Sequence, residues 1–232
     1  MYKYVIFDLD GTLLNTLGDL HAAVNHALRE MGFPERTMDE VRRFIGNGVV
    51  RLMERATPDG TDDLTNAKCL YIFREYYLQH MNDTTAPYEG ITGMLERLKE
   101  KGIKTAVVSN KLHSAVVGLC EETFPGLIDV ALGVNVEEER KPAPVNVFRA
   151  MSELNAECRV QNAEFCGYRS AAKHTKLYTI YIGDSEVDVQ TAKNAGLECI
   201  GVTWGFRDRE FLMFHGARVF IDKPMELVEI LA

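Results

Sequence analysis

The sequence predicts an α/β protein, with a Rossmann-like, doubly wound parallel sheet and an inserted all-helical module. Three observations predict this fold. Short apolar runs rich in β-branched residues recur along the chain, amphipathic helical patterns separate most of them, and one long stretch near the N-terminus contains helical patterns alone. Strands that alternate with helices pair in parallel, with helices on both faces of the sheet.

Six apolar segments are the expected strands, and their nearly continuous apolar character is typical of strands buried on both faces. These segments are residues 2–7, 104–108, 128–132, 178–182, 198–203 and 218–221. Ligands of doubly wound sheets bind beyond the carboxyl ends of the strands. The residues that follow each segment are therefore the first place to look for chemistry.

Residues 16–81 contain no convincing strand pattern and are expected to fold as a helical module inserted after the first strand. Apolar residues recur there at helical spacing, at Leu17, Leu20, Val24, Leu28 and Met31. Thr37 and Glu40 have the spacing of a capping box. The aromatic residues Tyr71, Phe73, Tyr76 and Tyr77 are expected in the module's core rather than in a base-stacking platform. The predicted domains are 1–15 with 82–232 as the core, and 16–81 as the helical module.

Composition restricts the partners and the compartment. With 46% hydrophobic and 26% charged residues the chain has ordinary globular usage, which argues against disorder. Its net charge of −8 argues against nucleic-acid and anionic-membrane surfaces. Five scattered cysteines without a CxxC pair, no signal-peptide pattern and no membrane-length apolar run predict a cytoplasmic protein.

A pair of carboxylates follows the first expected strand, in Asp8-Leu9-Asp10-Gly11-Thr12. The dipeptide Asp10-Gly11 alone would indicate only a solvated turn. Two neighbouring carboxylates can divide the work, one as a nucleophile and one as a proton carrier, because each makes ionisation of the other harder. The full motif therefore favours covalent catalysis through an acyl phosphate.

Three further segments carry polar residues near strand ends. They are Ser109-Asn110-Lys111, Lys141-Pro142, and Gly183 to Asp188, which contains the acidic pair Asp184 and Asp188. Taken singly, each has an ordinary interpretation as a turn, a loop lysine or a helix start. Together with the first motif they supply a nucleophile, a hydroxyl, a cation and an acidic cluster, which is what a transferring phosphoryl group needs. An all-oxygen site of this kind suits Mg²⁺.

These four segments resemble the ordered motifs of the haloacid dehalogenase superfamily, in its phosphoglycolate phosphatase-like branch with a helical cap. The matching segments are DLDGT at 8–12, VVSN at 107–110, KP at 141–142 and GDSEVD at 183–188. The resemblance extends over nearly the whole chain. It is most specific in the first motif and weakest in the two middle ones.

The resemblance implies a role for each motif residue. Asp8 would be the nucleophile, and Asp10 would act as acid for the leaving group and then as base for the hydrolytic water. Ser109, Asn110 and the catalytic Lys141 would contact the phosphate. Asp8, the carbonyl of Asp10 and Asp184 would bind Mg²⁺, and Asp188 and Thr12 would orient these groups.

The function predicted from these observations is Mg²⁺-dependent hydrolysis of a small phosphorylated metabolite, either phosphoglycolate-like or a sugar phosphate, through an aspartyl phosphate. A β-phosphoglucomutase-like sugar-phosphate mutase and an inorganic pyrophosphatase remain alternatives, because they would use the same motifs. A receiver-like signalling module fits poorly, since it is about half this length. The protein is expected to be a monomer or a homodimer. Residues 155–177, longer and more polar than relatives would have, suggest an inserted loop or a partner contact.

Overall fold

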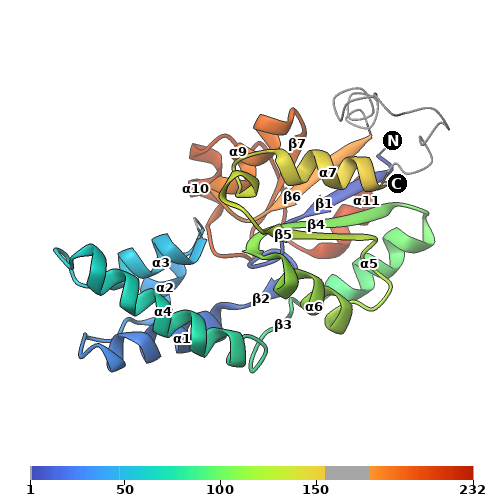
Figure 1. Cartoon of the computed structure of the whole chain (residues 1–232). Helices are drawn as coiled ribbons and strands as arrows, with labels where there is room; N and C mark the ends of the chain where they lie inside the picture. Colours follow the sequence, from blue (N-terminus) through green and yellow to red (C-terminus); the bar gives the residue numbers. More distant parts are fainter. Residues whose placement is uncertain (1, 47, 155–177, 232) are drawn as a thin grey trace, which may run out of the picture. The chain divides into compact units, whose positions relative to one another are not determined.

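The computed structural model describes residues 2–46, 48–154 and 178–231 (Figure 1). The expected insertion at 155–177 therefore lies outside the described residues. The chain divides into two compact units, a sheet unit of Met1–Leu13 with Pro87–Ala232 and a helical unit of Leu14–Ala86. The helical unit begins before, and ends after, the range of 16–81 expected from the sequence.

The sheet unit contains a six-stranded parallel sheet, so the predicted fold class is confirmed. Its strands run in the order β5-β4-β1-β6-β7-β8. Their bounds are Tyr4–Phe7 for β1, Lys104–Leu112 for β4, Val130–Val134 for β5, Thr179–Gly183 for β6, Glu198–Val202 for β7 and Val219–Ile221 for β8. Each overlaps one of the six apolar segments.

The end of β1 lies at the point where the order of strand addition reverses. From β1 the chain builds outward through β4 to β5, and it then returns to β6 on the other side of β1. Phe7 at the end of β1 pairs with Val107 on one side and Ile182 on the other. Asp8, the next residue, therefore lies at the topological switch point, where ligands of such sheets bind.

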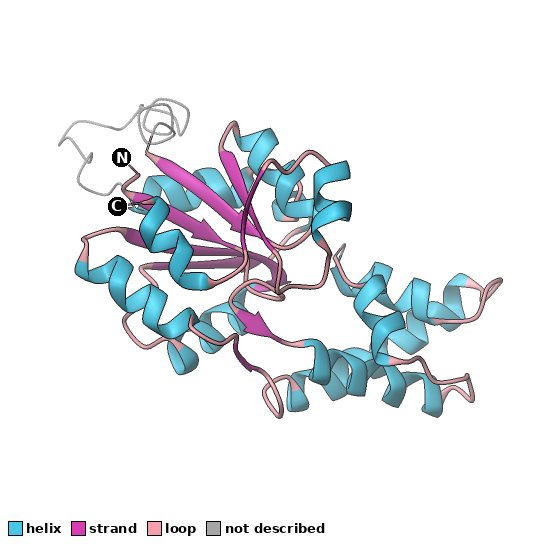
Figure 2. Ribbon diagram, turned by 180° about the vertical axis from the view of Figure 1, so that it is seen from behind, coloured by secondary structure: helices cyan, strands magenta, loops and turns pink. Residues whose placement is uncertain are grey.

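Helices cover both faces of this sheet (Figures 1 and 2). Their bounds are Ile91–Glu100 for α5, His113–Thr123 for α6, Val145–Leu154 for α7, Glu186–Ala195 for α9, Arg209–Phe214 for α10 and Pro224–Ile230 for α11, with a short 3₁₀ turn at Glu137–Glu139. One face packs against α7 and α9 through a buried cluster that includes Ile6, Val108 and Tyr181. Because both faces are covered, Val5, Ile6 and Phe7 are all buried, as the continuous apolar run predicts.

Among its described residues, the helical unit contains four helices and a pair of very short strands. The helices are α1 at Leu17–Glu30, α2 at Met38–Phe44, α3 at Gly48–Ala56 and α4 at Asp63–His80, and β2 at Leu14–Asn15 pairs with β3 at Ala86–Pro87. The capping box of Thr37 and Glu40 is present at the start of α2. In the part of the chain that the structure describes, no helix combines the length and the apolar character that crossing a membrane requires.

The core of the helical unit corrects one expectation about its aromatic residues. Phe73 and Tyr77 are buried in the core and Tyr76 packs against it, but the Tyr71 side chain is 63% exposed. Phe73 and Tyr77 lie four positions apart and share a face of α4, whereas two positions along a helix turn a side chain about 200° away. Tyr71 is therefore on the opposite face of the helix.

A buried carboxylate fastens the start of α1 to the segment before β3. Asp19 is 2% exposed and accepts hydrogen bonds from the backbone N–H and the hydroxyl of both Thr84 and Thr85, at distances of 2.5 to 3.2 Å. A Cβ at Gly18 would lie 2.4 Å from the Thr84 hydroxyl, so only glycine permits this close approach.

Replacing Asp19 with alanine is expected to destabilise the protein by about 2–4 kcal/mol, because the backbone and hydroxyl donors of Thr84 and Thr85 lose a buried, charged acceptor. The stability of Asp19→Asn, which keeps a single carbonyl acceptor, should lie between that of the wild type and that of Asp19→Ala. Chemical denaturation followed by circular dichroism measures the effect. Asp59→Ala, at an exposed loop position, is the control and should change stability by less than about 0.5 kcal/mol. Equal values for Asp19→Ala and the control would contradict the assigned role.

Candidate active site

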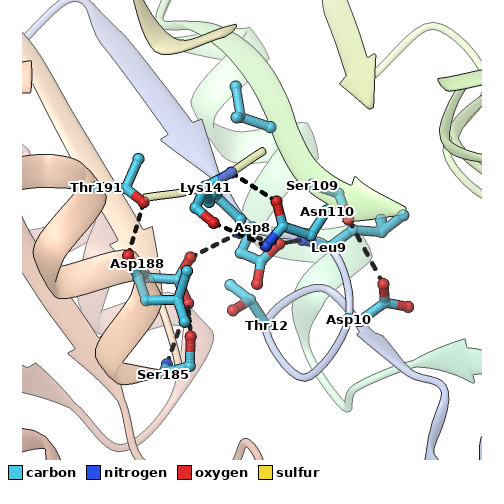
Figure 3. Close-up of polar contacts among 12 residues, drawn as sticks. Asp8, Leu9, Asp10, Thr12, Ser109, Asn110, Lys141, Ser185, Asp188 and Thr191 are labelled. Carbon is cyan, nitrogen blue, oxygen red and sulfur yellow. Dashed lines mark hydrogen bonds and ion pairs between the residues drawn. The ribbon is translucent and has the colours of Figure 1, made fainter. Parts of the chain in front are cut away.

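The four motifs converge at the carboxyl edge of the sheet (Figure 3). Asp8 follows β1, Asp184 follows β6, and Lys141 comes after the 3₁₀ turn beyond β5. Ser109 and Asn110, expected just after a strand, lie inside β4, whose pairing with β5 shifts register between Val108 and Leu112. Extended backbone thus continues past the apolar run that predicted the strand.

Asp8 is buried and held by the groups around it. Its backbone N–H donates to the carbonyl of Ile182, and its Oδ1 accepts from the Leu9 N–H at 2.7 Å and from Lys141 Nζ at 2.7 Å. Burial and the neighbouring Asp188 raise the pKa of Asp8 well above its usual value, and Lys141 opposes that rise. An ionised Asp8 therefore needs positive charge beside it.

Lys141 supplies part of that charge. Its ammonium lies 2.7 Å from Asp8 Oδ1 and 2.7 Å from Asp188 Oδ1, and the residue is only 4% exposed. Burial lowers the pKa of Lys141, but Asp188 and Asp8 more than offset this, so the pKa stands well above its usual value. The lysine is a charged group inside the site and not a solvated loop residue.

The Asn110 side chain contacts Lys141 rather than standing alone. Its Oδ1 accepts from the Lys141 backbone N–H at 2.7 Å, and its Nδ2 donates to the Lys141 carbonyl at 3.2 Å. The Asn110 amide therefore binds both the backbone N–H and the backbone carbonyl of Lys141. These two hydrogen bonds fix the backbone from which the lysine side chain extends. The contact with phosphate expected for Asn110 stays a prediction.

Asp184 lies in a close-fitting pocket of backbone and side-chain donors. Thr12 Oγ1 donates to its Oδ1 at 3.1 Å, and the Phe206 N–H donates to its Oδ2 at 2.7 Å. A Cβ at Gly11 or at Gly205 would lie 2.3 Å from atoms of Asp184, which explains why glycine occupies both positions. Burial and then Asp188 raise the pKa of Asp184 to about 7, although both hydrogen bonds lower it.

Asp188 has both carboxylate oxygens engaged by protein donors. Lys141 Nζ and the Tyr181 hydroxyl, at 3.2 Å, reach Oδ1. The N–H and hydroxyl of Ser185 donate to Oδ2 at 3.1 and 2.6 Å, which completes a capping box at the start of α9. These contacts are compatible with the orienting role that the resemblance implies for Asp188, which stays a prediction.

Asp10 lies near a second lysine. Lys111 Nζ is 3.0 Å from Asp10 Oδ1, with the lysine side chain 8% exposed, and Ser109 Oγ lies at a long 3.5 Å from Asp10 Oδ2. Ser109 Oγ also accepts from the Lys111 backbone N–H. The Asp10 carboxylate thus has an ammonium beside it, as Asp8 does.

Sequence reasoning assigned no role to three groups that contact the acidic residues. Lys111 directly follows Ser109-Asn110 in the sequence, and this position could have indicated that it contacts the site. A tyrosine in a fully buried strand needs a partner for its hydroxyl, so Tyr181 could also have been singled out. The Phe206 N–H belongs to the backbone, and nothing in the residue type marks it.

The acidic residues fit a hard divalent cation. Within the described residues, one group with metal-binding chemistry contains only carboxylates: Asp8, Asp184 and Asp188 each offer an oxygen, all within 4.8 Å of one another. Three buried carboxylates face one ammonium, that of Lys141, so the cluster has excess negative charge when ionised. Carboxylate oxygens without histidine or cysteine suit Mg²⁺. Asp188 already accepts from four protein donors, among them the Lys141 ammonium, whereas Asp184 accepts from two. The assignment of Asp8 and Asp184 as the metal ligands stays a prediction.

Comparison with known proteins agrees with this geometry. Residues 5–202 match the family described as haloacid dehalogenase-like hydrolase. The chain is 30% identical to the phosphoglycolate phosphatase of Vibrio parahaemolyticus, covering 99% of this chain and 96% of that one. It is 33% identical to the phosphoglycolate phosphatase of Cereibacter sphaeroides, covering 88% and 86%.

A solved structure shows the same fold. It comes from Lactobacillus delbrueckii subsp. bulgaricus and carries the provisional name phosphoglycolate phosphatase. It is 35% identical, with a TM-score of 0.81 and coverage of 99% of this chain and 98% of that one. The predicted family and the predicted class of enzyme, a phosphatase, are therefore confirmed. This chain belongs to the haloacid dehalogenase-like hydrolases, in the branch that contains the phosphoglycolate phosphatases.

Proposed function

We propose that the protein is a Mg²⁺-dependent phosphatase that hydrolyses a small phosphomonoester of the phosphoglycolate class through an aspartyl phosphate on Asp8. The observation that carries this proposal is the buried Asp8 carboxylate, bound by Lys141 and grouped with Asp184 and Asp188 at the switch point of the sheet. We also propose a cytoplasmic location, which the five scattered cysteines support.

In the first step, a carboxylate oxygen of Asp8 forms a bond to phosphorus while the ester oxygen leaves. The contacts of Oδ1 with Leu9 and Lys141 orient the carboxylate, so Oδ2 is the attacking oxygen. Asp10 gives a proton to the leaving oxygen. In the second step, Asp10 takes a proton from water, the water oxygen bonds to phosphorus, and phosphate departs to regenerate Asp8.

The remaining residues bind and orient. Ser109 and Lys141 would contact the phosphate oxygens, whose charge grows as the reaction proceeds. Asp8, the Asp10 carbonyl and Asp184 would hold Mg²⁺, and Thr12 and the Phe206 N–H keep the Asp184 carboxylate in place. Bound Mg²⁺ would supply the positive charge that lets a carboxylate and a phosphate approach each other.

The support for the substrate class is the set of relatives named phosphoglycolate phosphatase, at about 30% identity over most of the chain. A carboxylate-bearing phosphomonoester with a small leaving group is therefore the first compound to test. Sugar phosphates and pyrophosphate are the alternatives that the same motifs allow.

Phosphate release from 2-phosphoglycolate is expected to require Mg²⁺ and to stop when excess EDTA is added, because the carboxylate cluster then lacks its counter-charge. Mg²⁺ added beyond the chelator should restore the rate, which controls for damage by EDTA. The assay would also include β-glucose 1-phosphate, other sugar phosphates, nucleotides and pyrophosphate.

Each alternative outcome has its own meaning. Full activity in excess EDTA would refute the role of the metal. Conversion of β-glucose 1-phosphate to its 6-phosphate isomer without phosphate release would indicate a mutase. Preference for pyrophosphate would indicate a pyrophosphatase.

A further inference from the structure

Helix α4 carries a second, largely apolar stripe on the side that faces away from the core of its unit. The residues Leu64, Ala67, Tyr71, Arg74 and Leu78 follow one another at alternating spacings of three and four, and all are exposed. The side chains of Leu64, Tyr71 and Leu78 are 82%, 63% and 54% exposed. The opposite face, with Cys69, Phe73 and Tyr77, is the one buried in the core.

The spacing of this stripe, Leu64 to Leu78, is that of a helix that packs against another helix. Alternating steps of three and four place residues on one seam of a coiled coil, at the a and d positions of a heptad. A helix at the surface of a monomer is ordinarily polar on its outer face. Two large leucines and a tyrosine on that face therefore indicate a second contact surface.

Charged residues on and beside the stripe specify what that surface fits. Lys68 and Glu75 occupy equivalent flanking positions one heptad apart, and both are exposed. Among the described residues, neither of them, nor Arg74, forms an ion pair within the chain. The three charges are thus available to a partner.

We propose that α4 pairs with α4 of a second copy of this chain, antiparallel and around a two-fold axis near the middle of the helix. In antiparallel coiled coils a seam residue at an a position meets a d position of the other helix. With the axis near the middle of α4, that rule places Tyr71 against the partner's Arg74 and Ala67 against the partner's Leu78. The first contact is a cation–π pair and the second fits a small side chain beneath a large one.

The same register brings the flanking charges together. Lys68 lies beside the partner's Glu75, and symmetry repeats each of these contacts a second time. A parallel pair in register would instead place Arg74 on the partner's Arg74 in the seam, which is unfavourable. The charge pattern therefore selects the antiparallel arrangement.

The length of α4 limits the affinity that we expect for the dimer. Eighteen residues span about 27 Å at about 1.5 Å per residue, which is a short seam. An interface of this size lies at the lower end of the range for specific association. We expect a dimer with a micromolar dissociation constant.

Sedimentation velocity across about 1 to 500 μM, a range that brackets micromolar dissociation constants, tests the proposal. The mass should rise from 26.1 kDa toward twice that value as the concentration increases. Tyr71→Lys faces the partner's Arg74 with a like charge and should raise the dissociation constant at least about tenfold. Glu96→Lys, an exposed charge change on α5, is the matched control and should leave it unchanged.

A charge exchange tests the register. Lys68→Glu alone and Glu75→Lys alone should each weaken the dimer, since each creates two like-charge pairs. The double variant Lys68→Glu/Glu75→Lys should restore it. A mass that stays at 26.1 kDa throughout, a dimer insensitive to Tyr71→Lys, or a double variant weaker than both single ones would each overturn the proposal.

Discussion

Asp8→Asn protein is expected to lose at least about 10³-fold in phosphate release while it keeps its fold. An amide has nearly the shape of the carboxylate, and its oxygen can still accept the hydrogen bond from the Leu9 N–H. It cannot form an acyl phosphate, so the covalent route is closed. The prediction therefore separates the chemistry of Asp8 from its structural contacts.

Stability provides the second readout for Asp8→Asn. Burial and Asp188 raise the pKa of Asp8 in the folded protein, so the ionised form at neutral pH is less favourable folded than unfolded. Removing that charge is expected to leave the melting temperature of the metal-free protein equal or higher. Asp59→Asn, an exposed control, should change neither the activity nor the melting temperature.

The combination of results decides the assignment. Lost activity with an unchanged or higher melting temperature supports Asp8 as the nucleophile. Activity within about tenfold of the wild type would exclude it, because removing a nucleophile costs far more than that. Lost activity with an unfolded protein would assign Asp8 a structural role.

The fold followed from the sequence because its signals are local. A strand buried on both faces is a short apolar run, and each of the six strands was visible in that way. The capping box of Thr37 and Glu40 begins a helix through contacts three residues apart. The longer extent of β4 was not visible, because Ser109, Asn110 and Lys111 are polar and end the apolar run at Val108.

The sequence indicated which residues lie at the site, but not which of their atoms contact one another. Position after a strand indicates which residues share the edge of the sheet. The structure brings Asp8 and Asp184, which each follow a strand, together with Lys141, which follows a 3₁₀ turn. Position in the sequence does not show which polar atom meets which. That Asn110 holds the Lys141 backbone, and that Lys111 lies beside Asp10, depends on side-chain positions across different strands and loops.

Tyr71 illustrates the same limit in the helical unit. Four aromatic residues within seven positions look like one core cluster. Only the phase of α4 separates Phe73 and Tyr77 from Tyr71, and that phase is set by which face packs on α1. The exposure of Tyr71, where a core position was expected, is the observation that led us to propose a second contact surface on α4.

Replacing Lys141 with methionine is expected to lower kcat/KM by about 10²–10³-fold, the loss typical of removing one group that stabilises transition-state charge. The change also leaves the Asp8 and Asp188 carboxylates without their shared ammonium. Removing one partner of a buried ion pair costs about 3–5 kcal/mol of stability. The pKa of Lys141 is raised in the folded state, so its stabilising effect is fully present at neutral pH and would be lost only above its unfolded pKa of about 10.4.

A double variant separates the two effects of Lys141→Met. In Lys141→Met/Asp188→Asn the amide replaces one of the two stranded carboxylates, so much of the lost stability should return in denaturation experiments. Activity should not return, because the double variant still lacks the Lys141 ammonium that would contact the phosphate. Recovery of both would mean that Lys141 serves only to neutralise Asp188, and the phosphate contact would have to be assigned to another group. Recovery of stability alone, with kcat/KM still low, is the result that the position of the ammonium between Asp8 and Asp188 predicts.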